Sequence, residues 1–359
     1  MIITKIFAIN PGTTSTKVAL YDNRTELWNE SVFYSYRDLM RFNEPIDEED
    51  LRYDHVRGML QLHGADLSEI DAYVARGGLL HPLTSGAWVI NEDMIADLRS
   101  GVYGIHASSL GALLALRLAI ASGGKPAYIV DPVCVDEMTD VAHVSGIPDM
   151  PRKSIFHALN QRAVGYRLAE SMGKKLDECK FIIAHMGGGI TIGAHYLGKV
   201  IDVNDALGAY GPMTPDRAGT VHAMDIVKRC FSGKYTESQM KKMIIGNAGL
   251  AAHLGTNDFK DITKRAMSGE EKAILVVDAL SYQIAGEIGS RAAAMRGEVD
   301  AIILTGGLAY SDYLCKLIES RVSWIANVVR MPGEDELQAL CDGTYRVLTG
   351  QEEVKIYAR

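Results

Sequence analysis

The sequence predicts an α/β protein built from a duplicated unit, and three observations lead to that prediction. Apolar, strand-like runs alternate with helical patterns along the chain, which is typical of a mostly parallel or mixed sheet covered by helices on both faces. Three segments of the first half have counterparts, in the same order, in the second half. The chain has 359 residues, enough for two domains of roughly 150–200 residues each.

The paired segments are the main support for a duplication. Each begins with an apolar run that stops at a glycine or proline turn. The pairs are KIFAINPGTTSTKVALY (5–21) with KFIIAHMGGGITIGAHY (180–196), DAYVARGG (71–78) with DAIILTGG (300–307), and AYIVDP (127–132) with ANVVRMP (326–332). Ligands of such sheets bind beyond the carboxyl ends of the strands. Two similar halves therefore predict one cleft, lined by the turns of both.

Three helices are predicted from their apolar spacing and from the residues that end them. The patterns over 108–122 and 154–172 each stop at glycine, a common helix terminator. The third pattern, over 271–296, also stops at glycine and has one apolar face. That face consists of Ile274, Val277, Leu280, Ile284 and Ile288.

The composition excludes several classes of protein. Lys and Arg number 37 against 45 Asp and Glu, for a net charge of −8 without a basic block, so we expect no nucleic-acid partner. No apolar run reaches the ~18 residues of a spanning helix, and we expect no membrane partner. The five cysteines form no CxxC pair, and residues 1–10 lack the features of a signal peptide. A cytoplasmic location is expected.

Three glycine turns after apolar runs are candidates for phosphate binding, because glycine lets the backbone approach a ligand closely. The first combines Asn10, Thr13, Thr14, Ser15 and Lys17 around Gly12, although an ordinary polar hairpin is the alternative. The second is His185 followed by Gly187, Gly188 and Gly189, and the third is Gly306-Gly307. GxxxxGK[ST], strand-linked GxGxxG and HExxH patterns are absent. Phosphate binding shared between two halves is therefore favoured.

Four further side chains are candidates for catalysis, each with a structural alternative. Asp131 follows an apolar run and can hold Mg²⁺, or it opens an Asp-Pro turn. His157 lies early in a predicted helix, where a histidine is more often structural. Arg76 and Arg217 lie in glycine- or proline-rich turns, which suits phosphate or carboxylate binding, although solvated loop arginines are the alternative.

Taken together, these motifs resemble the acetokinase family, the carboxylate kinases of the wider sugar kinase/actin/Hsp70 group. The resemblance covers essentially the whole chain. The N-x-G-[ST]-[ST]-S-x-K opening matches the first turn, and the H-L-G-N-G loop matches His185 to Gly189. The family's H-N-P, F-D-x-A-F, F-H-G, T-R-S-G, G-G-x-G-E-N and N-E-E-L motifs are represented around His106, Asp131, His157, Arg217, Gly306-Gly307 and Glu334–Leu337.

The departures from the family pattern fit its butyrate kinase branch. The chain is shorter than acetate kinases, and Ala107 and Gly188 stand where those have Asn, which leaves room for a longer acyl chain. Arg76 replaces a substrate-side arginine that lies a few residues earlier in the family. The strings ARGGLLHP, HASSLGALLA, IVDPVCVDEM, IFHALNQ, AHMGGGITIGAH and MPGEDEL look like butyrate kinase motifs.

The resemblance implies a reversible transfer of phosphoryl from ATP to butyrate or a branched analogue such as isobutyrate, with Mg²⁺ as metal. It implies catalytic roles for Arg76, Asp131, His157 and Arg217. It also implies nucleotide or phosphate binding at the three glycine turns, a substrate pocket at Arg76 and His106, and metal ligands among Asp131, Glu334 and Glu336. Small-molecule carboxylate and nucleotide are the implied partners, and a homodimer or higher homo-oligomer is expected.

The implied fold is a pair of ribonuclease H-like βββαβαβα domains, 1–148 and 149–335, with an active-site cleft between them. The C-terminal helix, from about 336 to 359, is expected to pack back on the first domain. Three alternatives stay open: an acetate or propionate kinase, a sugar kinase of the same superfold, and a non-catalytic ATP-driven switch. A sugar kinase would need a general base for a neutral hydroxyl, and a switch would need a client-binding domain for which the chain has no room.

Overall fold

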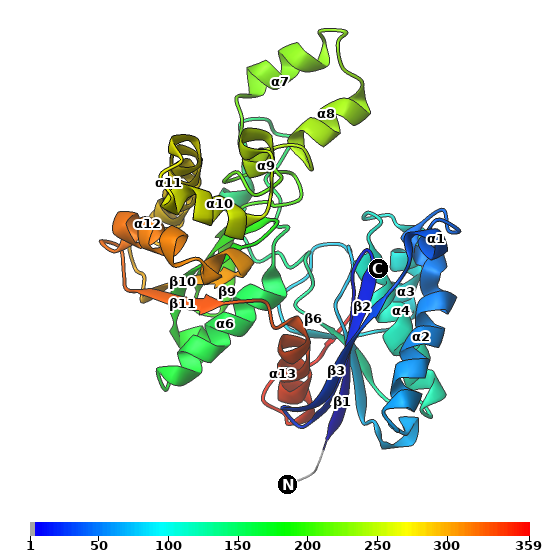
Figure 1. Cartoon of the computed structure of the whole chain (residues 1–359). Coiled ribbons are helices and arrows are strands. Elements are labelled where there is room, and N and C mark those ends of the chain that lie inside the picture. Colours follow the sequence, from blue (N-terminus) through cyan, green and yellow to red (C-terminus); the bar gives the residue numbers. More distant parts are fainter. Residues whose placement is uncertain (1–3) are drawn as a thin grey trace. The chain divides into compact units, whose positions relative to one another are not determined.

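The computed structural model describes residues 4–359, which form two compact α/β units (Figure 1). The first unit runs to Val135 and includes Asp335–Arg359, and the second is Asp136–Glu334. This division lies earlier than the boundary expected at 148, because Glu137 and Thr139 hydrogen-bond to backbone groups of Val200 and Ile201 in the second unit. None of the helices in the described part of the chain combines the length and apolarity needed to cross a membrane.

The first unit contains a seven-stranded sheet in the order β12-β5-β6-β4-β1-β2-β3. Its strands are β1 (Lys5–Pro11), β2 (Ser15–Asp22), β3 (Thr25–Phe33), β4 (Ala72–Ala75), β5 (Ala87–Val89), β6 (Ala127–Val130) and β12 (Lys355–Ile356). Strands β1, β2 and β3 pair as antiparallel hairpins, whereas β1, β4 and β6 are parallel neighbours. The residues that follow β1, β4 and β6 therefore meet at one edge of the sheet.

Helices cover this sheet with apolar side chains. The helix α4 (Leu110–Ala121) is apolar around most of its surface and contributes much of the core with β1, β4 and β6. The other helical elements of the unit are α1 (Tyr36–Leu39), η1 (Pro45–Glu48), α2 (Glu49–Leu62), η2 (Leu67–Glu69), α3 (Glu92–Ser100), η3 (Ala107–Ser109) and α13 (Glu336–Leu348). At α13, Gly343 lies against Val130 of β6, where a Cβ would come within 2.5 Å of its side chain.

The second unit contains a five-stranded sheet in the order β11-β10-β7-β8-β9. Its strands are β7 (Lys180–Met186), β8 (Ile190–Tyr196), β9 (Lys199–Val203), β10 (Ala301–Gly306) and β11 (Val328–Pro332). Strands β7, β8 and β9 are antiparallel, and β7, β10 and β11 are parallel. The order β9-β8-β7-β10-β11 repeats β3-β2-β1-β4-β6, and all three segment pairs from the sequence fall on corresponding strands. The predicted α/β duplication is confirmed.

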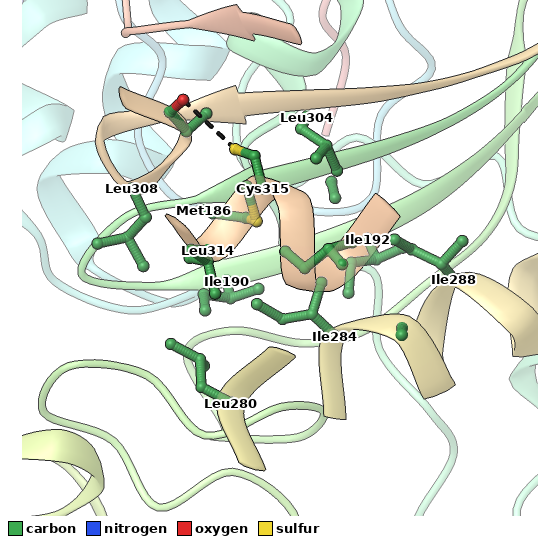
Figure 2. Packing of buried hydrophobic residues seen from close by; sticks show 14 of the residues in the cluster. Met186, Ile190, Ile192, Leu280, Ile284, Ile288, Leu304, Leu308, Leu314 and Cys315 are labelled. Atoms are coloured by element: carbon green, nitrogen blue, oxygen red, sulfur yellow. Dashed lines mark hydrogen bonds between the residues drawn. The ribbon is translucent and has the colours of Figure 1, made fainter. Parts of the chain in front are cut away.

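The core of the second unit lies between its sheet and the long helix α11 (Glu271–Ala294). Figure 2 shows Leu280, Ile284 and Ile288 of α11 facing Ile190 and Ile192 of β8. The other helical elements are α5 (Asp140–His143), α6 (Ala158–Ser171), η4 (Leu176–Glu178), α7 (Ala223–Cys230), α8 (Glu237–Ile244), α9 (Gly249–Leu254), α10 (Phe259–Met267), η5 (Gly307–Tyr310) and α12 (Asp312–Val322).

Three details of the predicted helices are wrong. The C-terminal helix expected over 336–359 ends at Leu348, because residues 355–356 pair with β5 as β12. Residue Ile274 is 38% exposed, since it lies at the margin of the buried face, where Ala273 and Val276 pack instead. Residues 154–157 are not helical, because the carbonyl of Ile155 accepts a hydrogen bond from the N–H of Ala206. The helix therefore begins after His157.

Candidate active site

The first glycine turn is the hairpin between β1 and β2. The N–H of Gly12 donates to the carbonyl of Ser15 at 2.7 Å, which closes the turn. Residues Thr13, Thr14 and Lys17 are exposed. Their hydroxyl, amide and ammonium donors are thus accessible to a ligand at this edge of the sheet.

A buried arginine that the sequence analysis missed supports this hairpin. The guanidinium of Arg52, on α2, is fully buried and donates to the carbonyls of Gly12 and Thr13 at 2.8 and 3.1 Å. It also pairs with Glu48, which compensates the buried charge. Arg52 therefore fixes the backbone of the turn from α2. An arginine at helical spacing from a glutamate reads as a surface pair in sequence, so no local signal identifies this role.

The end of β4 brings three of the predicted residues together. The guanidinium Nη1 of Arg76 lies 3.1 Å from Oε1 of Glu336, in the first turn of α13. The side-chain amide of Asn10, at the end of β1, donates to the same carboxylate. All three side chains are at least partly shielded from solvent. Glu336 thus orients both a cation and an amide at the carboxyl end of the parallel strands.

Asp131 follows β6 at the same edge. Its side chain is buried, and Oδ1 accepts a hydrogen bond from the N–H of Gly86 at 2.7 Å. Its backbone has φ of 41°, a left-handed conformation that costs energy for most residues but is tolerated by Asp and Asn. A buried carboxylate in a strained turn is often associated with function.

His106 lies near Arg76, and its ring accepts a hydrogen bond from the backbone. Its Nδ1 accepts the N–H of Ser108 at 3.1 Å, so the proton of the neutral ring is on Nε2. The pKa of His106 is lowered, first by the protein atoms crowded around the ring and second by the Arg76 charge, even though part of the ring is exposed. The ring is therefore neutral at pH 7.

The second unit brings His157 and His185 into direct contact. Their rings are stacked, with centroids 3.8 Å apart and planes 8° from parallel. His185 is almost fully buried, and its Nε2 lies 3.1 Å from Oε1 of Glu334 without hydrogen-bond geometry. These histidines, 28 positions apart in sequence, form one stacked pair.

The glycine loop after β7 runs along this histidine pair. A Cβ added to Gly189 would lie 3.1 Å from Cε1 of His157 and 3.2 Å from Nη1 of Arg217, and one added to Gly187 would lie 3.0 Å from Oε1 of Glu334. The loop backbone therefore lies between these groups at close range. By contrast, Gly188 is exposed and has no neighbour within 4 Å of an added Cβ.

Arg217 is held in place at both its backbone and its side chain. Its N–H donates to Thr214 Oγ1 at 3.0 Å, and its Nη1 donates to the carbonyl of Ala206. The buried Nε has no hydrogen-bond partner among residues 4–359, with Asp216 3.9 Å away. An unsatisfied buried N–H on a cation is costly unless a ligand completes it.

The third glycine turn ends β10. Gly306 has φ of +83°, and a Cβ there would come within 2.5 Å of the carbonyl oxygen of Met186, so both conformation and packing require glycine. No atom within 4 Å restricts a Cβ at Gly307, which is exposed. Of the two glycines, only Gly307 leaves room for a ligand.

The three predicted metal ligands, Asp131, Glu334 and Glu336, come from both units of the chain. Glu334 belongs to the second unit and Glu336 to the first, and residues 4–359 contain no group of three His, Cys, Asp or Glu able to hold a metal. Mg²⁺ commonly uses only one or two carboxylates and completes its shell with water and substrate phosphates. As carboxylates at one sheet edge, Asp131 and Glu336 fit that donor set.

The fully buried His195, on β8, predicts an acid sensitivity of the fold. Burial lowers its pKa to about 3, below the ordinary value near 6.5. Between these values the unfolded chain binds a proton that the folded chain does not, so stability is fully present above pH 6.5 and falls toward pH 3. We expect His195→Asn to flatten the decline by up to ~1.4 kcal/mol per pH unit. Urea unfolding at pH 7.5, 6 and 5 measures this, and equal slopes in both proteins would contradict it.

Known proteins resemble this chain in both sequence and fold. Residues 149–318 match the acetokinase family. Butyrate kinase 2 of Clostridium acetobutylicum is 47% identical over 353 residues, which cover 98% of this chain and 99% of that protein. An acetate kinase of Porphyromonas gingivalis (TM-score 0.78, 20% identity) and a propionate kinase of Francisella tularensis (0.75, 17%) share the fold over 95% of this chain and 99% of theirs.

Proposed function

The chain belongs to the acetokinase family, and we propose that it is a butyrate kinase, which transfers the γ-phosphoryl group of ATP to a short-chain carboxylate. The products are an acyl phosphate and ADP, and the reaction is reversible. The observation that carries the proposal is the 47% identity with a butyrate kinase over 98% of the chain. The arrangement of cations and hydrogen-bond donors in each unit supports it.

The proposed reaction is a direct in-line displacement. A carboxylate oxygen of the acid attacks the γ-phosphorus, the bond from that phosphorus to the β–γ bridging oxygen breaks, and ADP leaves with the electron pair. A short-chain acid with a pKa near that of ordinary carboxyl groups is ionised at pH 7, so no general base is needed. Catalysis then depends on positioning and on stabilising charge.

We propose the following roles for the cations and hydrogen-bond donors of each unit. Arg76, oriented by Glu336, pairs with the acid, and His106 donates its Nε2–H to it. Arg217 binds the transferring phosphoryl group, because its buried Nε–H lacks a partner in the described chain. His157, beside Gly189 and Arg217, donates to an equatorial oxygen of the same group. The donors therefore reduce repulsion between two anions.

Nucleotide and metal sites complete the proposal. The exposed hairpin donors of Thr13, Thr14 and Lys17 bind phosphate, and the open space at Gly307 accommodates the adenosine side of ATP. When bound, Mg²⁺ would supply charge neutralisation at the phosphates, held by Asp131 and by Glu336. Glu334 lies beside His185, and we assign it to that ion-pair position rather than to the metal.

The reverse reaction tests the proposed function. Purified protein with ADP, Mg²⁺ and butyryl phosphate is expected to form ATP, which luciferase detects. Parallel reactions with ATP and glucose or glycerol, followed by coupled ADP detection, test the sugar kinase alternative. Butyryl phosphate without ADP is the control for simple hydrolysis. Sugar-dependent ADP release without ATP formation from butyryl phosphate would overturn the proposal.

We also propose that the protein self-associates through α7. This helix buries no residue, and Met224, Val227 and Phe231 are exposed along one face. Figure 1 shows α7 and α8 extending from the rest of the second unit. An antiparallel α7 pair about a two-fold axis would join these apolar faces and bring Asp225 of each copy near Lys228 of the other. A second copy of the chain is therefore the proposed partner.

Phe231→Glu tests this surface. Phe231 is 86% exposed, so the change leaves the monomer intact but places a charge in the apolar contact. We expect the mass from light scattering to fall to that of a smaller species, with Trp324→Glu, which is 78% exposed in the turn after α12, as control. An unchanged mass for Phe231→Glu would exclude α7 as the contact.

The cysteines support a cytoplasmic location, which we propose. All five are free, and Cys230 is exposed. Free thiols persist in reducing compartments, where ATP is also available.

A further inference from the structure

The stacked histidines are followed by a chain of hydrogen bonds that ends at a second buried histidine. Gln161, on α6, donates through Nε2 to both the carbonyl and Oγ1 of Thr191, at 3.0 and 2.9 Å. Its Oε1 lies 2.8 Å from Nε2 of His195. Thr191 Oγ1 in turn lies 2.9 Å from Nδ1 of His157. The directions of these hydrogen bonds decide which ring nitrogens of the histidines carry a proton.

The direction of each bond follows from groups that have only one option. A backbone carbonyl can only accept, so the Gln161 atom facing the carbonyl of Thr191 is the amide nitrogen. Its other N–H donates to Oγ1, and Oε1 accepts from His195. Since burial keeps His195 neutral, with a pKa of about 3, the His195 proton is on Nε2.

The hydroxyl of Thr191 then has one remaining role. Its oxygen accepts from the Gln161 amide and, at 3.5 Å, from the backbone N–H of His157. A hydroxyl has two lone pairs and one hydrogen, so its hydrogen points to Nδ1 of His157. Nδ1 is thereby an acceptor, and the neutral ring carries its proton on Nε2.

His185 receives the opposite arrangement from the neighbouring helix residue. The amide of Asn160 donates to the carbonyl of Gly333 at 3.3 Å, which fixes Oδ1 as the acceptor of the Nδ1–H of His185 at 2.8 Å. The hydroxyl of Thr305 lies 3.3 Å from the same Oδ1 and 3.2 Å from the carbonyl of Gly333. Nδ1 of His185 therefore carries a proton, and its Nε2 faces Oε1 of Glu334 at 3.1 Å.

We infer that Thr191, oriented by Gln161, is a positioning residue that holds His157 as an Nε2–H donor, while Asn160 fixes the stacked His185 through its Nδ1–H. His157 thus presents its Nε2–H to the phosphoryl group, whereas Nε2 of His185 faces Glu334. The inference rests on the proposed function for its effect on rate, but not for its effect on the tautomers.

The variant pair Thr191→Val and Thr191→Ser tests this role. Valine has the same shape without the hydroxyl, whereas serine restores it. We expect Thr191→Val to lower kcat for butyryl phosphate formation by roughly 10–100-fold, as the loss of an orienting partner does elsewhere, with KM values little changed. Thr191→Ser is expected to regain most of the rate. Thr344→Val removes another fully buried threonine hydroxyl, one bonded within α13, and is expected to leave kcat unchanged.

Nitrogen NMR of histidine-labelled full-length protein provides the readout that a merely structural role would not move. The His157 signal, assigned by its loss in His157→Gln, is expected to report Nε2–H alone in the wild type and in Thr191→Ser. In Thr191→Val both tautomers are expected. A single, unchanged Nε2–H form in Thr191→Val, or a wild-type Nδ1–H form, would overturn the inference. Because the spectra need no substrate, a failure of the proposed butyrate kinase activity is distinguishable from a failure of this inference.

Discussion

Arg217→Ala is expected to lower kcat/KM for acyl phosphate formation by about 10³–10⁵-fold, the range for removing an arginine that stabilises a transferring phosphoryl group. The reason is local. The buried Nε–H of Arg217 has no partner in the described chain, and Nη1 lies beside the Gly189 backbone next to His157. Loss of the side chain removes one bond to the carbonyl of Ala206, so the unfolding free energy should fall by only about 1 kcal/mol.

Two further variants sharpen this test. Arg217→Lys keeps the charge but loses the planar, multiple donors of guanidinium, and should recover only part of the rate. Arg321→Ala removes an arginine of the same unit that pairs with Asp278, and should leave kcat unchanged. Steady-state kinetics together with urea unfolding measure both quantities. A near-wild-type rate for Arg217→Ala would remove this residue from the site.

Asp131→Asn is expected to raise the Mg²⁺ concentration for half-maximal activity at least tenfold and to lower kcat on the order of 100-fold, because it removes a ligand charge. The change is close to isosteric. Asparagine tolerates the left-handed backbone at φ of 41°, and its carbonyl can still accept the N–H of Gly86. The fold should therefore persist.

The control for Asp131→Asn is Asp342→Asn, which neutralises another buried carboxylate of the same unit, one paired with Arg24. It should leave the metal dependence of the rate unchanged. Activity titrated with Mg²⁺ at fixed, saturating ATP and acid measures the effect for both variants. An Asp131→Asn protein with the wild-type metal titration would exclude Asp131 as a metal-binding residue.

Much of the fold could be predicted from the sequence because strand and turn signals are local. The matched runs at 5–21 and 180–196 are the hairpins β1–β2 and β7–β8, and the later pairs are β4 with β10 and β6 with β11. The ends of the helices were harder to predict from the sequence. At the start of α6, a hydrogen bond between Ile155 and Ala206, distant in sequence, stops the helix from including 154–157.

Some residues of the candidate site could likewise be predicted from the sequence, and others could not. Residues in glycine turns could be predicted, since glycine patterns indicate close approach of the backbone to a ligand. The side chains that hold these residues in place could not be predicted. Arg52 reaches the β1–β2 turn from α2, and Thr191 looks like an ordinary strand residue until Gln161 and His157 are seen beside it. Such roles depend on contacts between elements, which no local pattern encodes. Glu334 and Glu336 appear equivalent in sequence, yet the boundary between the two units falls between them.

The measurement that tests the central claim most directly is acyl phosphate formation across a series of acids. The protein is incubated with MgATP, hydroxylamine and straight or branched acids of two to six carbons, and the acyl hydroxamates are quantified as kcat/KM. Each buried methylene is worth about 0.8 kcal/mol, so neighbouring acids should differ by several-fold. We predict a maximum at butyrate or isobutyrate. A maximum at acetate would overturn the assignment to butyrate, and hydroxamate formation with none of the acids would contradict the carboxylate kinase account itself.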